Sequence, residues 1–547
     1  KGLDRFNNWF NRMAIGYKGV IGWALDHRLI VVGLSVATFV FALAMPAMGL
    51  VGFAFFPADD NSELLLTVET PPGSNLDYTR LKAVEAAALA RAMPEVQYTL
   101  TTVGGASGAV DAASIYVKLS KKNQRTRSAD SLSKLLRDQV PTIGGATVSV
   151  FTNTFGGNEK QIQLQMRGND PEALQAVAEK YVAAVRQVPG AVDVGLSTKG
   201  QKPELNVEVN RGLAGSLGLT VGSVAQALRP AFAGIEVGDW VDPAGETRKV
   251  VVRLDDEMRS RAADLERLPI AVGGGGPGGG EGTTVPLGQV ARVTPSVGPA
   301  IISHLNRDNV VNVQANAAGR PLSEVIAGIN EATASIPLPP GVRVTQGGEV
   351  ESQNVVFSSM LAAMGVAVLL MYLILVLQFG SFLDPLAIML SLPLSLIGVM
   401  GALSITGSTI NLMSLIGVLM LMGIVAKNAI LLVDFAKWAR EKDGVPLREA
   451  LIQAGAIRLR PILMTTFALV AGMIPIALGR GEGAGFRAPL GIAVVGGVIT
   501  STVLTLLAIP TFYEILDELR HWFASKVGMR APKTAEFPVV PGAVAGD

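Results

Sequence analysis

The chain has 547 residues, 49% of them hydrophobic and 17% charged, with a mean hydropathy of +0.40, which is too high for an ordinary soluble protein and indicates membrane segments. The 46 Lys and Arg nearly balance the 45 Asp and Glu, so no excess of positive charge points to nucleic acid. Cysteine is absent and only three histidines occur, which excludes disulfides and thiolate zinc sites and argues against a histidine-based metal or catalytic cluster; we expect no cofactor.

Six apolar runs, nearly free of charge, are long enough to cross a bilayer as helices. They cover residues 29–51, 355–379, 385–406, 411–435, 461–478 and 490–516. A mostly polar stretch, residues 52–352, follows the first run. The sequence therefore predicts an α+β membrane protein with one transmembrane helix at 29–51, a large loop, and five further helices within 353–516.

Lysines and arginines near the helix ends predict the orientation. They cluster before the first run, between the fourth and fifth, and after the sixth: Arg5, Arg12, Lys18, Arg28; Lys437, Arg440, Lys442, Arg448, Arg458, Arg460; Arg520, Lys526, Arg530, Lys533. With six spans all three clusters fall on one side, which the positive-inside rule makes cytoplasmic. Residues 1–28 are then a cytoplasmic-side amphipathic segment, 517–547 a cytoplasmic tail, and the large loop is periplasmic.

The large loop reads as two copies of a ferredoxin-like βαββαβ module. In the first copy, residues 52–159, we expect strands at 63–70, 97–103, 114–119 and 147–152 and helices at 77–92 and 128–139. The second occupies 160–202 and 299–352, with strands at 161–167, 310–315 and 342–346 and helices at 171–188 and 322–336. Residues 203–298 are an insert. Its glycine run, 273–280, lacks the Lys-Ser/Thr of a phosphate-binding loop and is interpreted as a hairpin tip.

Lys427 lies inside the fourth apolar run, about two turns before the charged end that begins at Asp434. A buried ammonium is costly unless it is paired or hydrated, so we favour an ion-coupling role; the alternative is a lysine that snorkels to the interface. The carboxylates near the spans, Asp384, Asp434 and Glu514, sit at helix ends. Since the chain also starts at a lysine rather than a methionine, we interpret it as a piece of a longer polypeptide whose missing part, or a separate subunit, supplies buried acids.

Three further polar residues accompany Lys427. Arg458 and Thr465 are seven residues apart and share a helical face if that helix begins early, although Arg460-Pro461 is typical of a helix start. Arg458 could instead be a cytoplasmic anchor, and Thr465 could bond back to its own helix. Asn428 could serve helix packing or a proton path.

Small residues in the sixth run are interpreted as packing residues. They are Gly491, Gly496, Gly497, Thr500 and Ser501.

Five blocks carry a resemblance to a known family. They are Phe6-Asn7-Asn8-Trp9-Phe10-Asn11-Arg12, Gln378-Phe379-Gly380-Ser381-Phe382-Leu383-Asp384-Pro385, residues 423–437, Arg458-Leu459-Arg460-Pro461-Ile462-Leu463-Met464-Thr465-Thr466, and Gly496-Gly497. Up to about Phe523 the chain resembles the C-terminal half of a resistance-nodulation-division (RND) transporter of the hydrophobe and multidrug efflux branch. This implies two porter subdomains with a docking insert in a bacterial inner-membrane protein, a homotrimer, a periplasmic adaptor and an outer-membrane channel.

The resemblance also implies a proton relay. In this family a lysine faces two aspartates from the N-terminal half, with an arginine and a threonine nearby, and these roles fall on Lys427, Arg458 and Thr465. The drug exporters carry a phenylalanine-rich switch loop and pocket, whereas residues 103–110 here contain no aromatic side chain. Tyr116 and Phe151 are the nearest candidates for a pocket wall.

The leading hypothesis is a proton-driven exporter of amphiphilic or drug-like compounds. The metal-exporting branch of the family is an alternative, but it needs clustered thioether ligands, and the loop's methionines, Met93, Met166 and Met258, are scattered. A non-transporting scaffold has no reason to bury Lys427. An enzyme is disfavoured because no nucleophile, base and orienting group assemble.

Overall fold

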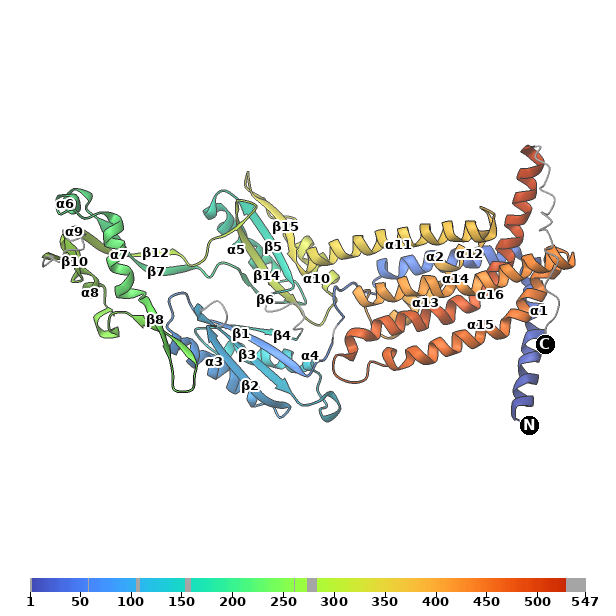
Figure 1. Ribbon diagram of the computed structural model, residues 1–547, viewed down its shortest axis with the longest axis horizontal. Coiled ribbons are helices and arrows are strands. Elements are labelled where there is room, and N and C mark those ends of the chain that lie inside the picture. Colours follow the sequence, from blue (N-terminus) through green and yellow to red (C-terminus); the bar gives the residue numbers. More distant parts are fainter. Residues whose placement is uncertain are drawn as a thin grey trace. The chain divides into compact units, whose positions relative to one another are not determined.

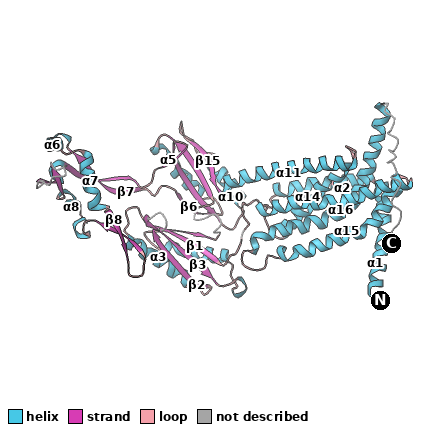
Figure 2. Cartoon of the chain, in the orientation of Figure 1, coloured by secondary structure: helices cyan, strands magenta, loops and turns pink. Residues whose placement is uncertain are grey.

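The computed structural model describes the backbone of residues 2–57, 59–104, 109–152, 159–259, 261–272 and 283–527 (Figure 1). It divides into a larger unit, Lys1–Glu69, Thr79–Ser197 and His304–Asp547, and a smaller unit, Thr70–Tyr78 and Thr198–Ser303. Among the described residues, all strands lie between α2 and α11 in the chain, and long helices make up the rest (Figure 2).

The apolar runs form helices of the larger unit. Six helical stretches of the described chain are long and apolar enough to cross a membrane. The helices are α1 (Gly2–Asp26), α2 (Arg28–Ala47), α11 (Glu349–Phe379), α12 (Asp384–Met389), α13 (Ser391–Ile405), α14 (Leu412–Asp443), α15 (Leu447–Ala477) and α16 (Ala484–Val527). The third stretch, expected as one helix, is two, α12 and α13, which meet at Leu390.

The expected helix start at Arg460-Pro461 is wrong. Helix α15 begins at Leu447 and carries Pro461 in its interior. Ala450, Leu451 and Ala454 in the added turns are fully buried, in a bundle where α15 packs against α1 and α16. Because most helical stability in proteins comes from such packing, the contacts outweigh the hydrogen bond that proline removes.

Glycines of α16 allow close helix packing, as the sequence predicted. A Cβ atom at Gly496 would lie 2.5 Å from the carbonyl oxygen of Gly398 on α13. A Cβ atom at the neighbouring Gly497 would lie 3.0 Å from Val399 Cγ2 and closer still to Leu421 on α14. Helix α16 therefore approaches α13 and α14 at a distance that only small residues permit.

Replacing Gly496 with leucine should separate α16 from α13. Since the nearest atoms are the Cβ of Ala402 and the backbone of Gly398, which cannot rotate away, relaxation is limited, and we expect a loss of at least about 3 kcal/mol of stability. Thermal unfolding of the purified protein in detergent would measure it. Gly472→Leu on α15, where a Cβ meets nothing within 4 Å, is the control. Equal unfolding temperatures for both variants would contradict close packing at Gly496.

The first module has the element order β1, α3, β2, β3, α4, β4. Its bounds are β1 (Glu63–Glu69), α3 (Leu76–Arg91), β2 (Val96–Gly104), β3 (Ala109–Leu119), α4 (Ala129–Gln139) and β4 (Thr147–Phe151). The antiparallel sheet has the order β2-β3-β1-β4. Leu64, Leu66 and Val68 of β1 are fully buried against α3 and α4, so alternate residues such as Leu65 lie on the opposite face of the sheet.

The second module repeats this topology and contains a strand that was not predicted. Its elements are β5 (Ile162–Gly168), α5 (Pro171–Val185), β6 (Ala191–Leu196), β13 (Ser303–Leu305), β14 (Asp308–Ala317), α10 (Leu322–Thr333) and β15 (Arg343–Gly348). The four main strands follow the order β6-β14-β5-β15, the same relative order as β2-β3-β1-β4. The smaller unit is therefore inserted between the second and third strands of this module. Strand β6 escaped prediction because its residues show no alternation between buried and exposed positions.

The smaller unit consists of short elements around its own core. They are β7 (Gln201–Val209), α6 (Arg211–Ser216), α7 (Val221–Phe232), β8 (Ile235–Val241), β9 (Thr247–Val252), α8 (Ala262–Glu266), β10 (Pro269–Val272), β11 (Thr283–Pro286), α9 (Leu287–Val290) and β12 (Ala291–Pro299). The glycine run at 273–280 lies outside the described residues. The strands that flank it, β10 and β11, pair antiparallel.

Candidate functional site

Lys427 lies near the middle of α14, on a stripe that the rest of this chain leaves exposed. Met420, Gly423, Asp434 and Trp438 are exposed on the same stripe, whereas Val425, Ala426, Ala429, Leu432 and Val433 are buried. Within the part of the chain that the structure describes, the Lys427 ammonium has no hydrogen bond or ion pair. Lys427 thus places a positive charge at mid-helix on an exposed surface, with no partner in the described ranges.

Arg458 faces α14 from the neighbouring helix α15. Its guanidinium carbon lies 5.1 Å from the centre of the Phe435 ring, in cation–π geometry. Its Nε atom is buried and has no hydrogen-bond partner among the described residues. Arg458 therefore packs inside the helix bundle, which a simple interfacial anchor would not require.

Thr465 lies at about the same level as Lys427. The helices α14 and α15 are joined by residues 444–446 and run antiparallel. Lys427 precedes Phe435 by about 12 Å of helix rise and Thr465 follows Arg458 by about 10 Å, both in the direction away from that loop. The Thr465 hydroxyl donates to the carbonyl oxygen of Ile462, 3.0 Å away, so in this state it bonds within its own helix.

Asn428 is not on the exposed stripe. Its side chain is only 7% exposed, while the neighbouring Lys427 is exposed, so the two point to different sides of α14. Asn428 therefore lies on a different side of α14 from Lys427. A buried amide between helices is typical of packing through hydrogen bonds.

Charged contacts gather at one end of the helices. The Lys437 ammonium donates to the carbonyl oxygen of Phe379 at 2.7 Å, and Arg440 pairs with Asp517 at 3.0 Å. Arg28 lies 3.3 Å from Glu514. These contacts join the ends of α11, α14 and α16 to the start of α2, so regions that the sequence assigns to one side of the membrane meet in the structure.

The structure brings Tyr116 and Phe151 together in the first module. Both pair with Leu65 of β1, from β3 and β4, on the sheet face away from α3 and α4. The Tyr116 hydroxyl donates to Glu63 Oε2 at 2.7 Å, and burial together with this carboxylate raises the pKa of Tyr116 to about 12. The Tyr98 ring lies 6.3 Å from the Tyr116 ring. Sequence reasoning missed Glu63 and Tyr98, which alternation along the strands could have placed on this face.

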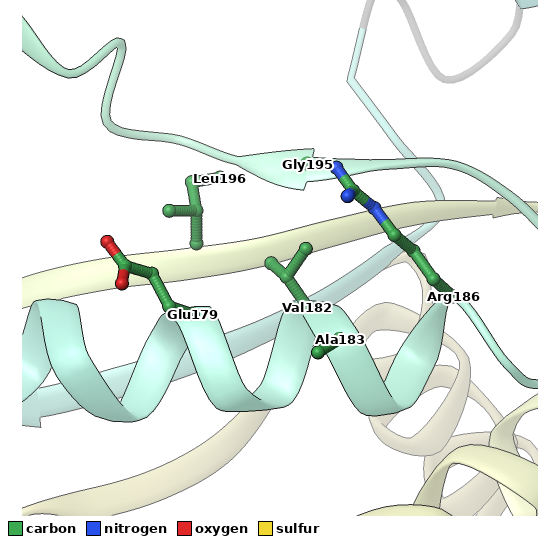
Figure 3. A pocket seen from close by; sticks show the side chains of 6 residues that line it. All are labelled: Glu179, Val182, Ala183, Arg186, Gly195 and Leu196. Carbon is green, nitrogen blue, oxygen red and sulfur yellow. The ribbon is translucent and has the colours of Figure 1, made fainter.

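A separate cavity lies in the second module (Figure 3). It has a volume of about 370 Å³ and is lined by Glu179, Val182, Ala183 and Arg186 of α5 and by Gly195 and Leu196 of β6. Its floor is apolar, and Glu179 and Arg186 stand two helical turns apart (Figure 3). None of the residues that the sequence singled out lines it.

The methionines of the loop lie in three different environments. Met93 is buried in the core of the first module, Met166 is buried in the core of the second, and Met258 of the smaller unit is 64% exposed. Within the described ranges they form no thioether cluster. The same ranges contain no group of three or more His, Cys, Asp or Glu side chains suited to a metal ion.

The described chain combines long apolar helices with paired α/β modules, which lie in the sequence between the first and second apolar stretches. The model of the AcrB/AcrD/AcrF family matches residues 1–517, so the chain belongs to this family of RND transporters. Two solved structures of a heavy metal efflux pump, in two crystal forms, are similar to it, with 25% sequence identity and TM-scores of 0.76 and 0.75. Each match covers 92% of this chain and 52% of the pump chain, so this chain spans about half the length of those relatives.

Proposed function

We propose that this chain is the C-terminal half of a proton-driven exporter in a bacterial inner membrane. The six apolar stretches span the bilayer, residues 1–28 and 517–547 are cytoplasmic, and 52–352 are periplasmic. The two ferredoxin-like modules act as porter subdomains, with residues 203–298 as the docking insert. A homotrimer, a periplasmic adaptor and an outer-membrane channel complete the export path.

One observation carries this proposal: Lys427 lies at mid-helix with no partner among the described residues, level with Thr465 and two turns from Arg458. In a membrane such a cation requires carboxylates, which the N-terminal half supplies against the exposed stripe of α14. Ionised carboxylates hold the ammonium, and protonation of one weakens that attraction. The proton thereby biases two arrangements of α14, which is the requirement for coupling a gradient to transport.

The substrate proposed is an amphiphilic, drug-like compound. Leu65, Tyr98, Tyr116 and Phe151 share one sheet face, where aromatic rings can pack against apolar groups. Metal export is the second candidate, favoured by the likeness to the heavy metal efflux pump. The separated methionines count against it for this half, because soft-metal sites need convergent thioether or thiolate ligands.

Reconstitution of the complete transporter, with its N-terminal half, tests the substrate class. Under an imposed proton gradient we expect an amphiphilic dye to be exported and Cu⁺ or Zn²⁺ to remain. Phe151→Ala should reduce dye export severalfold with proton uptake retained. Metal export without dye export would overturn the amphiphile proposal in favour of the second candidate.

Single cysteines test the orientation, since the chain has no cysteine of its own. Lys122→Cys, in the first module, should react with a membrane-impermeant thiol reagent in spheroplasts, whereas Glu441→Cys, at the end of α14, should react only after lysis. Both positions are exposed in this chain, so burial would not hide them. Reaction at Glu441→Cys in intact spheroplasts would contradict the orientation.

A further inference from the structure

We propose that residues 52–57 and 59–62, in the connection from α2 to β1, form the mechanical link between helices α14 and α16 of the bundle and the two porter modules. This inference rests on the proposed function of proton-driven transport. The segment, called here the coupling linker, contacts the starts of four helices. Two of these, α14 and α16, belong to the helix bundle, and two, α10 and α4, belong to the modules.

Residues 52–54, called here the first branch of the coupling linker, are attached to α14. The Ile410 N–H donates to the carbonyl oxygen of Gly52 at 2.8 Å, and the Ala54 N–H donates to the carbonyl oxygen of Ile410 at 3.0 Å. Phe53 and Ile410 form a β-bridge. Ile410 directly precedes Asn411, whose side chain caps α14. Backbone hydrogen bonds thus fix this branch to the start of the helix that carries Lys427.

Gly52 and Phe53 are also attached to α10 of the second module. The Phe53 N–H donates to Ser323 Oγ at 3.2 Å, and the Ser323 N–H donates to the carbonyl oxygen of Phe53 at 3.4 Å. A Cβ atom at Gly52 would lie 2.7 Å from Pro321 Cγ, so the backbone passes close to this helix start. Residues 52–54 are therefore held between α14 and α10, and a displacement of one reaches the other through them.

Phe56 and Asp59, called here the second branch of the coupling linker, are attached to α16. The Phe56 and Phe486 rings lie 6.0 Å apart. A Cβ atom at Gly485, in the first turn of α16, would lie 3.1 Å from the carboxyl carbon of Asp59 and still closer to Asp59 Oδ1. The Asp59 carboxylate thus occupies the space that a side chain at 485 would take. A carboxylate at this position also interacts favourably with the positive end of the helix dipole.

The adjacent carboxylate, Asp60, is attached to α4 of the first module. The Ala129 N–H, at the start of α4, donates to Asp60 Oδ2 at 3.0 Å, and the nearly inaccessible Arg125 guanidinium pairs with Asp60 Oδ1. The Ser62 N–H also donates to Asp60 Oδ1, at 3.1 Å. Two consecutive acids therefore join the start of α16 to the start of α4.

These contacts connect each module separately to the helix bundle that contains Lys427. Helices α14 and α16 pack against each other, and α14 carries Lys427. A shift of α14 passes through Phe53 to α10, and a shift of α16 passes through Asp59 and Asp60 to α4. These backbone hydrogen bonds and half-buried carboxylates form a short path that transmits displacement, so Gly52, Phe53, Asp59 and Gly485 act as positioning residues for transport.

The experiment measures protons taken up per substrate exported by the complete transporter in proteoliposomes. Asp59→Ala removes the contact with α16, and Gly485→Ala forces Asp59 away from it; we expect each to lower export at least tenfold, keep the substrate Kd within twofold and raise the proton-to-substrate ratio about tenfold. Gly472→Ala, where a Cβ meets nothing within 4 Å, should keep the wild-type ratio. A purely structural defect lowers export and proton uptake together, so an unchanged ratio in the first two variants would overturn the proposal.

A cysteine pair gives an independent test that does not depend on destabilising variants. In Phe53→Cys with Ile410→Cys, oxidation should leave export unchanged, because the linker and the start of α14 move together. Export that is lost on oxidation and restored by reduction would overturn the first branch. A wild-type transporter without any proton-dependent export would instead refute the proposed function, and the coupling linker with it.

Discussion

Replacing Lys427 with alanine in the complete transporter is expected to reduce proton-driven export by at least about 100-fold, equivalent to about 2.7 kcal/mol in the transport barrier. The ammonium is the group that carboxylates of the N-terminal half would hold or release as they lose or gain a proton. Without it, protonation no longer changes the attraction on α14. Substrate affinity should stay within about twofold, because the periplasmic sheet face of Tyr116 and Phe151 is formed by other elements.

Two comparison variants sharpen this test. Lys427→Arg keeps the charge but should also fail, because a planar guanidinium does not reproduce a compact ammonium in a helix seam. Met420→Ala lies on the same exposed stripe of α14 without a charge and should export nearly normally. Normal export by Lys427→Ala would reduce Lys427 to an interfacial anchor, and a parallel loss of substrate binding would assign it to folding.

Replacing Asp60 with asparagine is expected to destabilise the first module by about 3 kcal/mol, because it leaves the buried Arg125 charge without its carboxylate. A cysteine at the fully buried Leu132 of α4 reports this, since the chain has no other. Its reaction with a thiol reagent through local opening should become about 100-fold faster. Asp130→Asn, which removes an exposed i,i+4 pair with Lys134 on the same helix, is the control and should change the rate little.

The reaction of the cysteine at position 132 should depend on pH, and the direction follows from the direction in which folding shifts the pKa of Asp60. Burial alone would raise the pKa of Asp60, but hydrogen bonds from Ala129 and Arg125 outweigh it and hold the pKa below its ordinary value. A lowered folded-state pKa contributes stability that is present above the unfolded pKa of about 3.9 and is lost as the pH falls through the folded value. The wild-type module should therefore open more readily only below about pH 4, and Asp60→Asn should remove this dependence. An acid transition that persists in Asp60→Asn would assign it to another group.

The apolar helices could be predicted from sequence because length and composition alone indicate such segments. Helix boundaries were predicted wrongly where packing determines them. Pro461 is locally typical of a helix start, but it lies inside α15 because the preceding turns are buried. Strand β6 was not predicted, for a related reason. Its positions are all half-buried, so no period of two appears, and Asp193 within it has a positive φ of 55°.

The candidate site was predictable to the extent that a charge inside an apolar run is visible. Lys427 met that condition, and the seven-residue spacing placed Arg458 and Thr465 on one face once α15 extended past them. Other contacts could not be predicted from the sequence, because they join residues far apart in the chain. They are the packing of Arg458 on the Phe435 ring and the contacts of Asp59 and Asp60 with helix starts. Asn428 adjoins Lys427 in the sequence but lies on another side of α14, since consecutive helical residues are about 100° apart, and its role in a proton path stays a prediction.

The most direct test of the central claim is a measurement of proton movement driven by substrate alone. The complete transporter is placed in proteoliposomes without a pH gradient, and an outward-facing substrate gradient is imposed while internal pH is recorded. Antiport predicts proton movement opposite in direction to the substrate for the wild-type protein and none for Lys427→Ala. Substrate movement that proceeds without proton movement in the wild-type protein, or with equal proton movement in Lys427→Ala, would contradict the proposed coupling.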